Sequence, residues 1–214
     1  MFFIVWGWRS QTKRLSEGLF HCPREGGDRN YWLMEAKRWF TLFWIPVIPL
    51  RVLGEYVQCV SCGSTYDPAI RSLPTTVEFE DTLSRAMRRI VVSMIKADGH
   101  IADSERRTAV AIIGAFTTGA YSLDNLDDDL GNLDSGDSEV TRLSGLLNDR
   151  GKESVVRACV ELAGADGALD RSELDRIAQL GRDFGMSPAH VRGILADGTA
   201  PPNVAISDRS VSAS

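Results

Sequence analysis

The sequence contains no long apolar segment. Its longest apolar stretch runs from Trp39 to Leu50 and is interrupted by Pro46 and Pro49, whereas a membrane-spanning helix needs roughly 20 apolar residues. Residues 1–6 are apolar but lack a basic leader and a cleavage site of small residues, so we expect no secretory signal. We therefore predict a cytoplasmic protein, and in that compartment clustered cysteines more often hold a metal than form disulfides.

Catalytic motifs are missing as well. There is no glycine-rich phosphate loop, no nucleophile elbow and no Ser/His/Asp series in a hydrolase order. Three histidines are present, and only His100 lies within an acidic motif. This scarcity favours a binding or sensing protein over an enzyme. The enzymatic alternative is a metal-dependent hydrolase, for which His100 is the one candidate base.

Charge is divided unevenly along the chain. Residues 1–71 contain nine Lys or Arg and six Asp or Glu, a net charge of +3, while the rest carries −8, for a total of −5. Such asymmetry predicts two units with different partners. Because phosphates need basic side chains to neutralise them, we expect no nucleic acid on the acidic part, which is better suited to cations.

Three of the four cysteines lie in the basic part. Cys59 and Cys62 form a Cys-x-x-Cys turn followed by Gly63, the pattern with which a zinc knuckle offers two thiolates. A second turn, at Cys22, has the proline and glycines of a knuckle but carries Glu25 where a second cysteine is expected. We therefore predict a Zn²⁺ site with Cys22, Glu25, Cys59 and Cys62 as its ligands.

Two alternatives to this zinc site remain open. His21 is a second candidate for the fourth ligand, although adjacent residues rarely reach one metal in such a turn. Alternatively, the ribbon has no metal and is held by its aromatic core. Segment 39–44 is expected to belong to that core, with a protein-binding or membrane-surface patch as the other interpretation of the same residues. The fourth cysteine, Cys159, lies on an apolar helical face, and we expect it in a core rather than at a site.

The spacing of apolar residues predicts the fold class. Residues 1–71 are rich in β-formers, and Pro46 and Pro49 restrict their segment to an edge strand or a turn. From residue 79 the apolar residues follow a helical period, whereas the acidic stretch 124–137 is expected to be a solvated loop or a short linker. We predict a mainly α protein, with an all-helical domain and a small N-terminal β domain. The boundaries are a zinc-ribbon-like domain at 1–71, a linker at 72–78, the helical domain at 79–196 and a disordered tail at 197–214.

An internal repeat lies within the helical part. Residues 97–105 and 165–173 both read Ala-Asp-Gly-x-(Ile/Leu)-x-x-Ser-Glu, each between two amphipathic helical segments. Oxygen ligands favour hard cations, so the repeat predicts a site for Ca²⁺, Mg²⁺ or Mn²⁺. Its expected ligands are Asp98, Glu105, Asp166 and Glu173. The alternative is helix capping, because Asp170 and Glu173 form a capping-box pattern.

Two family resemblances rest on these motifs. Residues 1–71 resemble a zinc-ribbon module found at the N-terminus of some bacterial proteins, through the run Trp39–Leu50 and the pattern Cys59-x-x-Cys62-Gly63-x-x-Tyr66. The paired Asp-Gly-x-(Ile/Leu)-x-x-x-Glu signatures resemble the TerB-like family, helical domains associated with tellurite resistance and stress response in bacteria. This resemblance covers about residues 79–196. It implies an all-α fold and acidic residues as metal ligands, without a settled activity.

These observations together predict a non-enzymatic, metal-linked binding or sensing protein of a bacterial stress response, related to tellurite resistance and acting through a protein partner. A membrane-surface adaptor is a further alternative to the hydrolase. It rests on Lys37 and Arg38, which lie beside Trp39 and permit peripheral membrane contact.

Overall fold

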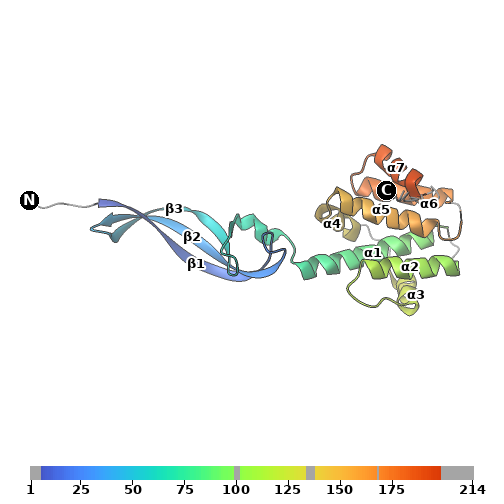
Figure 1. Cartoon of the computed structure of the whole chain (residues 1–214), viewed down its shortest axis with the longest axis horizontal. Helices are drawn as coiled ribbons and strands as arrows, with labels where there is room; N and C mark the ends of the chain where they lie inside the picture. Colours follow the sequence, from blue (N-terminus) through green and yellow to red (C-terminus); the bar gives the residue numbers. More distant parts are fainter. Residues whose placement is uncertain (1–5, 99–101, 134–137, 168, 199–214) are drawn as a thin grey trace, which may run out of the picture. The chain divides into compact units, whose positions relative to one another are not determined.

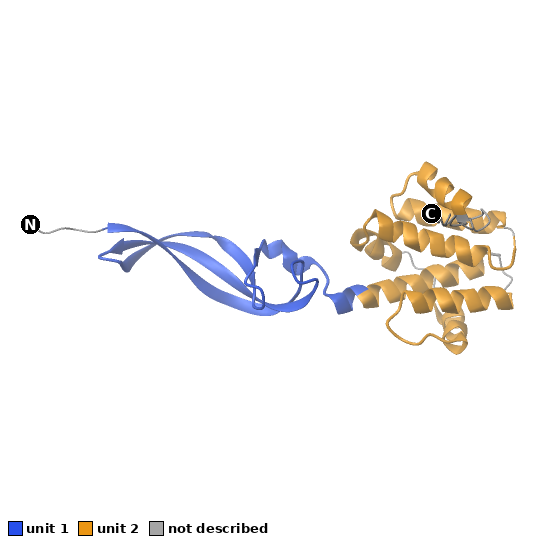
Figure 2. Ribbon diagram, in the orientation of Figure 1, with its two compact units in different colours: residues 1–79 blue, residues 80–214 orange. Residues whose placement is uncertain are grey.

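The computed structural model describes residues 6–98, 102–133, 138–167 and 169–198, except for the side chain of Asp98. The chain divides into two compact units, residues 1–79 and residues 80–214 (Figure 2). In the described residues, the first unit is built on a four-stranded antiparallel sheet and the second on α-helices (Figure 1). The helical and β parts of the prediction are both confirmed, but the strands take up more of the chain than a mainly α class allows.

The sheet is an antiparallel meander. Its three long strands are β1 (Trp6–Cys22), β2 (Gly27–Leu42) and β3 (Ile45–Cys59), followed by the short β4 (Thr65–Tyr66) and a 3₁₀ helix, η1 (Pro68–Ser72). Strand β4 pairs only with Val57 and Gln58, so most of β3 is an edge strand. An edge tolerates Pro46 and Pro49, which lack the N–H that a central strand would use. The edge position predicted from these prolines is therefore confirmed.

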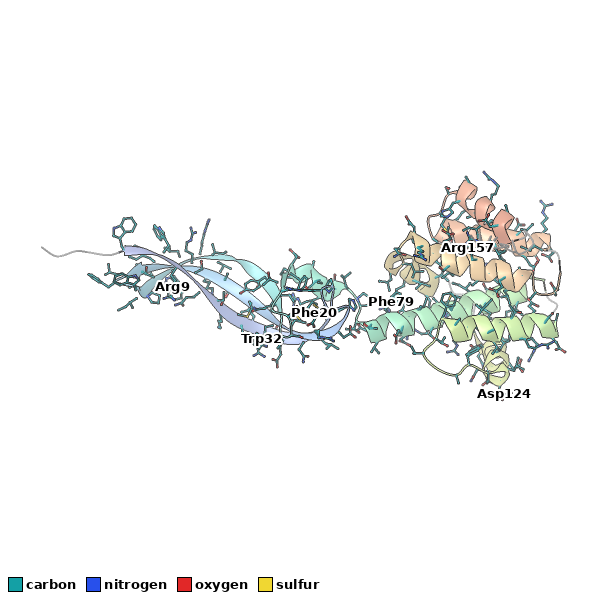
Figure 3. All side chains as sticks on the ribbon, viewed as in Figure 1. Arg9, Phe20, Trp32, Phe79, Asp124 and Arg157 are labelled. Atoms are coloured by element: carbon teal, nitrogen blue, oxygen red, sulfur yellow. The ribbon has the colours of Figure 1, made fainter. Side chains whose placement is uncertain are left out.

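The buried core of the sheet lies at its cysteine end. Phe20, labelled in Figure 3, is fully buried there, with its ring centroid 5.7 Å from those of Tyr31 and Tyr66 in edge-to-face contacts. The expected aromatic core at 39–44 is wrong, because Phe43 and Trp44 are 48% and 72% exposed. Residues of β4 and η1 pack on the cysteine end, and in the described part of the chain no second layer covers the other end.

Seven helices follow the sheet in the described residues. They are α1 (Thr76–Asp98), α2 (Asp103–Ala115), α3 (Leu123–Asn132), α4 (Ser138–Leu146), α5 (Asp149–Ala163), α6 (Arg171–Asp183) and α7 (Pro188–Gly198). Helix α5 contacts α2, α6 and α7, and seven of its residues are buried. Cys159 is one of them, as expected, and burial raises the pKa of its thiol to about 12. None of the described helices has both the length and the apolarity needed to cross a membrane.

The boundary between the units falls after Phe79, within α1. Helix α1 already begins at Thr76, so the residues expected as a linker include its first turn. Of the predicted tail, only its first two residues are described, as the end of α7.

The described part of the acidic stretch 124–137 forms helix α3, so the expected loop is wrong there. Ser122 accepts a hydrogen bond from the backbone N–H of Asn125, whose side chain accepts one from the backbone of Ser122. This capping box satisfies backbone groups at the helix start. Leu126 is fully buried in the helical core, and Asp129 is also buried. The sequence prediction missed this short amphipathic helix because its many aspartates resemble those of a loop.

Asp129 is the buried member of a polar group of three residues, whose other two members, Arg88 and Tyr121, are partly exposed. Its carboxylate accepts hydrogen bonds from Arg88 Nε and from the Tyr121 hydroxyl, both at 2.6 Å. Burial alone would raise the pKa of Asp129, but the hydrogen bonds and the charge of Arg88 hold it below its usual value. Burial and the adjacent carboxylate raise the pKa of Tyr121. This group ties α1 to α3.

Candidate metal centre

Two turns of the same construction face each other at the end of the sheet. After Cys22, the N–H of Gly26 donates to the carbonyl of Cys22 at 2.9 Å, with a φ of 64° at Gly26. After Cys59, the N–H of Gly63 donates to the carbonyl of Cys59 at 3.0 Å, with a φ of 71° at Gly63. Left-handed backbone strongly favours glycine. The knuckle pattern read from the sequence is therefore a real turn at both places.

These turns bring three thiols together. The sulfur atoms of Cys22, Cys59 and Cys62 all lie within 4.8 Å of one another, and those of Cys22 and Cys62 are 3.8 Å apart. A tetrahedral zinc with Zn–S bonds of about 2.3 Å would place its sulfurs about 3.8 Å apart. All three cysteines are free thiols. The cluster is therefore close enough to hold a metal ion.

The cluster is partly shielded from solvent. Cys22 and Cys59 are buried, and Cys62 is partly exposed. Burial raises the pKa of Cys59, whereas hydrogen bonds from Ser64 lower that of Cys62 to about 7. Because a metal binds the thiolate rather than the thiol, Cys62 is more readily available as a ligand at neutral pH than Cys59.

Tyr66 contributes a contact that the sequence did not predict. Its hydroxyl lies 3.3 Å from the sulfur of Cys22, within hydrogen-bond range for sulfur. A donor there stabilises a thiolate at Cys22. The available signal was the tyrosine three residues after Gly63, which was considered only as part of the family pattern.

Glu25 occupies the position in its turn that Cys62 occupies in the other, three residues after the leading cysteine. Its carboxylate does not join the sulfurs in the structure. Instead, it accepts hydrogen bonds from Arg29 Nε at 2.6 Å and from Ser61 Oγ at 2.8 Å. The hydrogen bond from Ser61, followed by the interactions with Arg29, lowers the pKa of Glu25 and keeps it ionised. Its role as a ligand stays a prediction.

His21, the other candidate fourth ligand, is engaged elsewhere. Its Nδ1 lies 3.2 Å from Thr76 Oγ1 and 3.5 Å from Asp28 Oδ1. Asp28 in turn accepts hydrogen bonds from the N–H of Thr76 at 2.9 and 3.0 Å. These contacts join Thr76 to the start of β2 within the first unit, so the ring of His21 is already engaged there.

Two of the four acids of the repeat are buried at equivalent helix positions. Glu105 and Glu173 are both buried and stand at the same position, three residues after the caps of α2 and α6. Asp166 is exposed, and both the side chain of Asp98 and the whole of His100 lie outside the described residues. Cation binding by these four acids is therefore still a prediction.

The capping interpretation is confirmed for the second copy. The carboxylate of Asp170 accepts from the N–H of Glu173 at 2.9 Å, and that of Glu173 accepts from the N–H of Asp170 at 2.8 Å. In the first copy, Ala102 stands at the cap and makes no side-chain hydrogen bond. The two copies therefore share a helix position and differ in how their caps are satisfied.

The comparison with known protein families matches the helical unit. A family described as tellurite resistance protein TerB matches residues 84–196, more than half of the chain. The chain belongs to the TerB family. The match runs from α1 to α7 of this TerB-family chain and leaves the sheet and its cysteines outside. What the cysteine cluster does must therefore be argued from its own geometry.

A solved structure of a protein of unknown function from Porphyromonas gingivalis W83 is similar to the chain, with 19% sequence identity and a TM-score of 0.42. The similarity covers 56% of this chain and 95% of that one. No curated protein matches the chain.

Proposed function

We propose that this TerB-family chain is a non-enzymatic, metal-linked binding protein with a tellurite-resistance-like role in bacterial stress response. In this proposal the sheet unit is a zinc ribbon that presents a binding surface, and the helical unit carries the family's role. Membership of the TerB family supports the second part. The first part rests on the cysteine cluster.

The single observation that carries the zinc proposal is the convergence of Cys22, Cys59 and Cys62. They come from the turn after β1 and the turn after β3, which are separated in sequence by β2 and β3, so their approach is a property of the fold. Three thiolates are a donor set suited to Zn²⁺ and poorly suited to Ca²⁺ or Mg²⁺, which take oxygen ligands. A soft, tetrahedral ion is therefore the best fit.

A structural role for the zinc follows from the size of the core. Only six apolar residues are buried in the described part of the sheet unit, and two of them are Cys22 and Cys59 themselves. Small domains with so little buried surface need a disulfide or a metal to be stable. The zinc would supply this stability by joining the two turns, as structural zinc sites do.

Glu25 is the proposed fourth ligand. Its place in the turn matches that of Cys62, and an ionised carboxylate can bind zinc through oxygen. To reach the ion, it must release Arg29 and Ser61, which now hold its two oxygens. The bound ion would replace these exposed contacts with a stronger one.

The helical unit is proposed to act through a protein partner and, as the acidic repeat predicts, through a hard cation. A cation at Asp98, Glu105, Asp166 and Glu173 would have to draw Glu173 away from its cap. Thermal unfolding of the chain with and without added Ca²⁺, Mg²⁺ or Mn²⁺, compared with an Asp98→Asn/Asp166→Asn variant, tests this. Absence of a cation-dependent rise in midpoint in the parent chain would remove the cation from the proposal.

Elemental analysis of the purified full chain tests the zinc proposal. We expect about one zinc per chain, its loss in Cys59→Ser/Cys62→Ser, and its retention in the matched control Cys159→Ser, which removes a buried thiol from the helical unit. A parent chain without zinc, or a control that loses as much as the cluster variant, would contradict it.

A further inference from the structure

The end of the sheet opposite the cysteines exposes an unusual concentration of apolar side chains. We call this end, residues 6–14 and 37–53, the ribbon tip; Arg9 lies in it and Phe20 lies in the cysteine end (Figure 3). Trp6 and Trp44 are 63% and 72% exposed. The other exposed large apolar residues of the tip are Trp8, Leu42, Phe43, Ile45, Val47, Ile48, Leu50, Val52 and Leu53. A patch of this kind marks an interaction surface.

Strand register places many of these side chains on one face. Residues directly opposite each other in a sheet point to the same side, and the two rows that cross the tip are Trp6–Leu42–Ile45 and Trp8–Phe40–Ile48. The rings of Trp6 and Trp8 lie 6.1 Å apart, and those of Trp8 and Phe40 lie 5.7 Å apart. One face of the tip is therefore a continuous aromatic and aliphatic surface.

The turn at the end of the tip holds two aromatic residues in an unfavourable backbone conformation. Phe43 and Trp44 join β2 to β3 with φ values of 48° and 65°, where hairpins normally use Asn-Gly. Left-handed backbone is unfavourable for side chains with a Cβ. Since folding alone would favour small residues here, the exposed aromatic pair points to a role outside the fold.

A basic row borders the apolar face. Arg38 lies directly opposite Arg51 on the same face, and both are exposed. Like charges placed opposite each other repel, so an anion between them would be stabilising. The tip as a whole carries six basic residues and no acidic residue. Arg9, Lys13, Arg38 and Arg51 have no ion pair with an acidic residue in the described part of the chain.

We propose that the ribbon tip inserts shallowly into the surface of an anionic lipid membrane. The distance from Leu42 to Arg38 is about 13 Å at roughly 3.3 Å per residue. With the arginines at the phosphates, this length spans the headgroup region, about 5–8 Å thick, and enters only the outer part of the hydrocarbon core of about 30 Å. Trp side chains favour this depth, and the arginine row would meet the lipid phosphates. This inference goes beyond the zinc-linked binding role proposed above.

The edge strand also suits a lipid environment. Unpaired backbone N–H groups are costly in lipid, and Pro46 and Pro49 of the edge strand β3 have no N–H to leave unpaired. Apolar residues occupy the turn and the bulged positions of β3 as well as one face. Fluid lipid can surround such a surface, whereas a protein groove would cover one side of it.

Sedimentation of the zinc-loaded full chain with vesicles tests the proposal, using phosphatidylcholine alone and phosphatidylcholine mixed with phosphatidylglycerol. We expect binding to the mixed vesicles with a blue shift of tryptophan emission. Arg38→Gln/Arg51→Gln should weaken binding about 30-fold, from the loss of two basic residues near the surface. Phe43→Asn/Trp44→Gly should weaken it at least about tenfold while giving the turn its favoured residues.

Leu19→Ser is the matched control, because Leu19 is an exposed leucine of β1 outside the tip. It should bind the mixed vesicles as the parent does. Failure of the parent to bind them, or equal losses in the control and the turn variant, would overturn the proposal. Concentration-dependent self-association that the turn variant abolishes, without vesicle binding, would instead assign the tip to a second copy of the chain.

Discussion

The sulfur atoms of Cys22 and Cys62 lie 3.8 Å apart in two turns that close on each other at the end of the sheet. The two turns differ at the position three residues after the leading cysteine, where one turn has Cys62 and the other has Glu25. Glu25→Cys should therefore raise zinc affinity by completing four thiolates. Glu25→Ala should lower it at least about tenfold, the loss that even outer-shell partners produce. Competition with a chromophoric chelator measures both, and unchanged affinity in both variants would exclude Glu25 as a ligand.

Metal removal should affect the two units differently. All five tryptophans lie in the sheet unit, so their emission reports on it, whereas the helical signal in circular dichroism comes mainly from the other unit. A strong chelator should shift the emission of the partly buried Trp32 and Trp39 to the red and leave most of the helical signal unchanged, because structural zinc contributes to folding only where it is bound. An unchanged emission spectrum after complete zinc removal would mean that the ribbon folds without metal.

Asp129 should make the stability of the helical unit depend on acid pH. Its folded-state pKa is lowered, so the ionised carboxylate stabilises the fold above the unfolded pKa of about 3.9, and this contribution is lost as the pH falls through the folded pKa. Asp129→Asn should cost about 1–2 kcal/mol at neutral pH, since it removes charge-assisted hydrogen bonds to an arginine whose side chain is still 37% exposed to screening solvent.

Urea unfolding, followed by the helical signal at several pH values, measures this cost. Asp128→Asn is the control, because Asp128 is an exposed neighbour in the same helix. The variant with Asp129→Asn should also lose part of the acid dependence. Equal effects of the two substitutions would show that the Arg88–Asp129 pair does not stabilise the fold.

The turn of the ribbon tip should become more stable when its aromatic residues are replaced. Phe43→Asn/Trp44→Gly is expected to raise the free energy of unfolding of the sheet unit by about 2 kcal/mol, because two left-handed residues of roughly 1–2 kcal/mol each are relieved. Denaturation of the zinc-loaded chain, followed by the remaining tryptophans, measures it. A fall in stability would mean that Phe43 and Trp44 support the fold itself.

Substitution by alanine should have opposite effects on the stability of the helical unit at two glycines. A Cβ at Gly181 in α6 would overlap Cγ2 of Val191 in α7, whereas a Cβ at Gly114 in α2 meets no atom within 4 Å. Gly181→Ala should cost about 1–3 kcal/mol through overpacking. Gly114→Ala should stabilise by up to about 1 kcal/mol through helix propensity. Thermal unfolding of the helical unit distinguishes them, and equal shifts would contradict the packing of α6 on α7.

The predictions that succeeded from sequence rested on strict local geometry. A Cys-x-x-Cys turn needs a left-handed residue after it, so Gly63 revealed the knuckle, and Gly26 revealed its partner. Pro46 and Pro49 excluded a central strand for the same local reason. The repeat was recognisable because both copies place a glutamate at the third position of a helix.

The predictions that failed depended on long-range packing. Helix α3 was hidden because its aspartates resemble a solvated loop, and only its contacts bury Leu126 and Asp129. The aromatic run was assigned to the core because composition cannot show which end of a sheet is covered. Tyr66 reaches Cys22 only across the folded turn, so no spacing rule predicted that contact.

X-ray absorption at the zinc edge of the full chain is the most direct test of the metal centre. We predict a shell of three sulfur atoms at about 2.3 Å and one oxygen at about 2.0–2.2 Å, from Cys22, Cys59, Cys62 and Glu25. Glu25→Cys should convert the spectrum to four sulfurs. A parent spectrum dominated by oxygen or nitrogen would contradict zinc binding by the cysteine cluster.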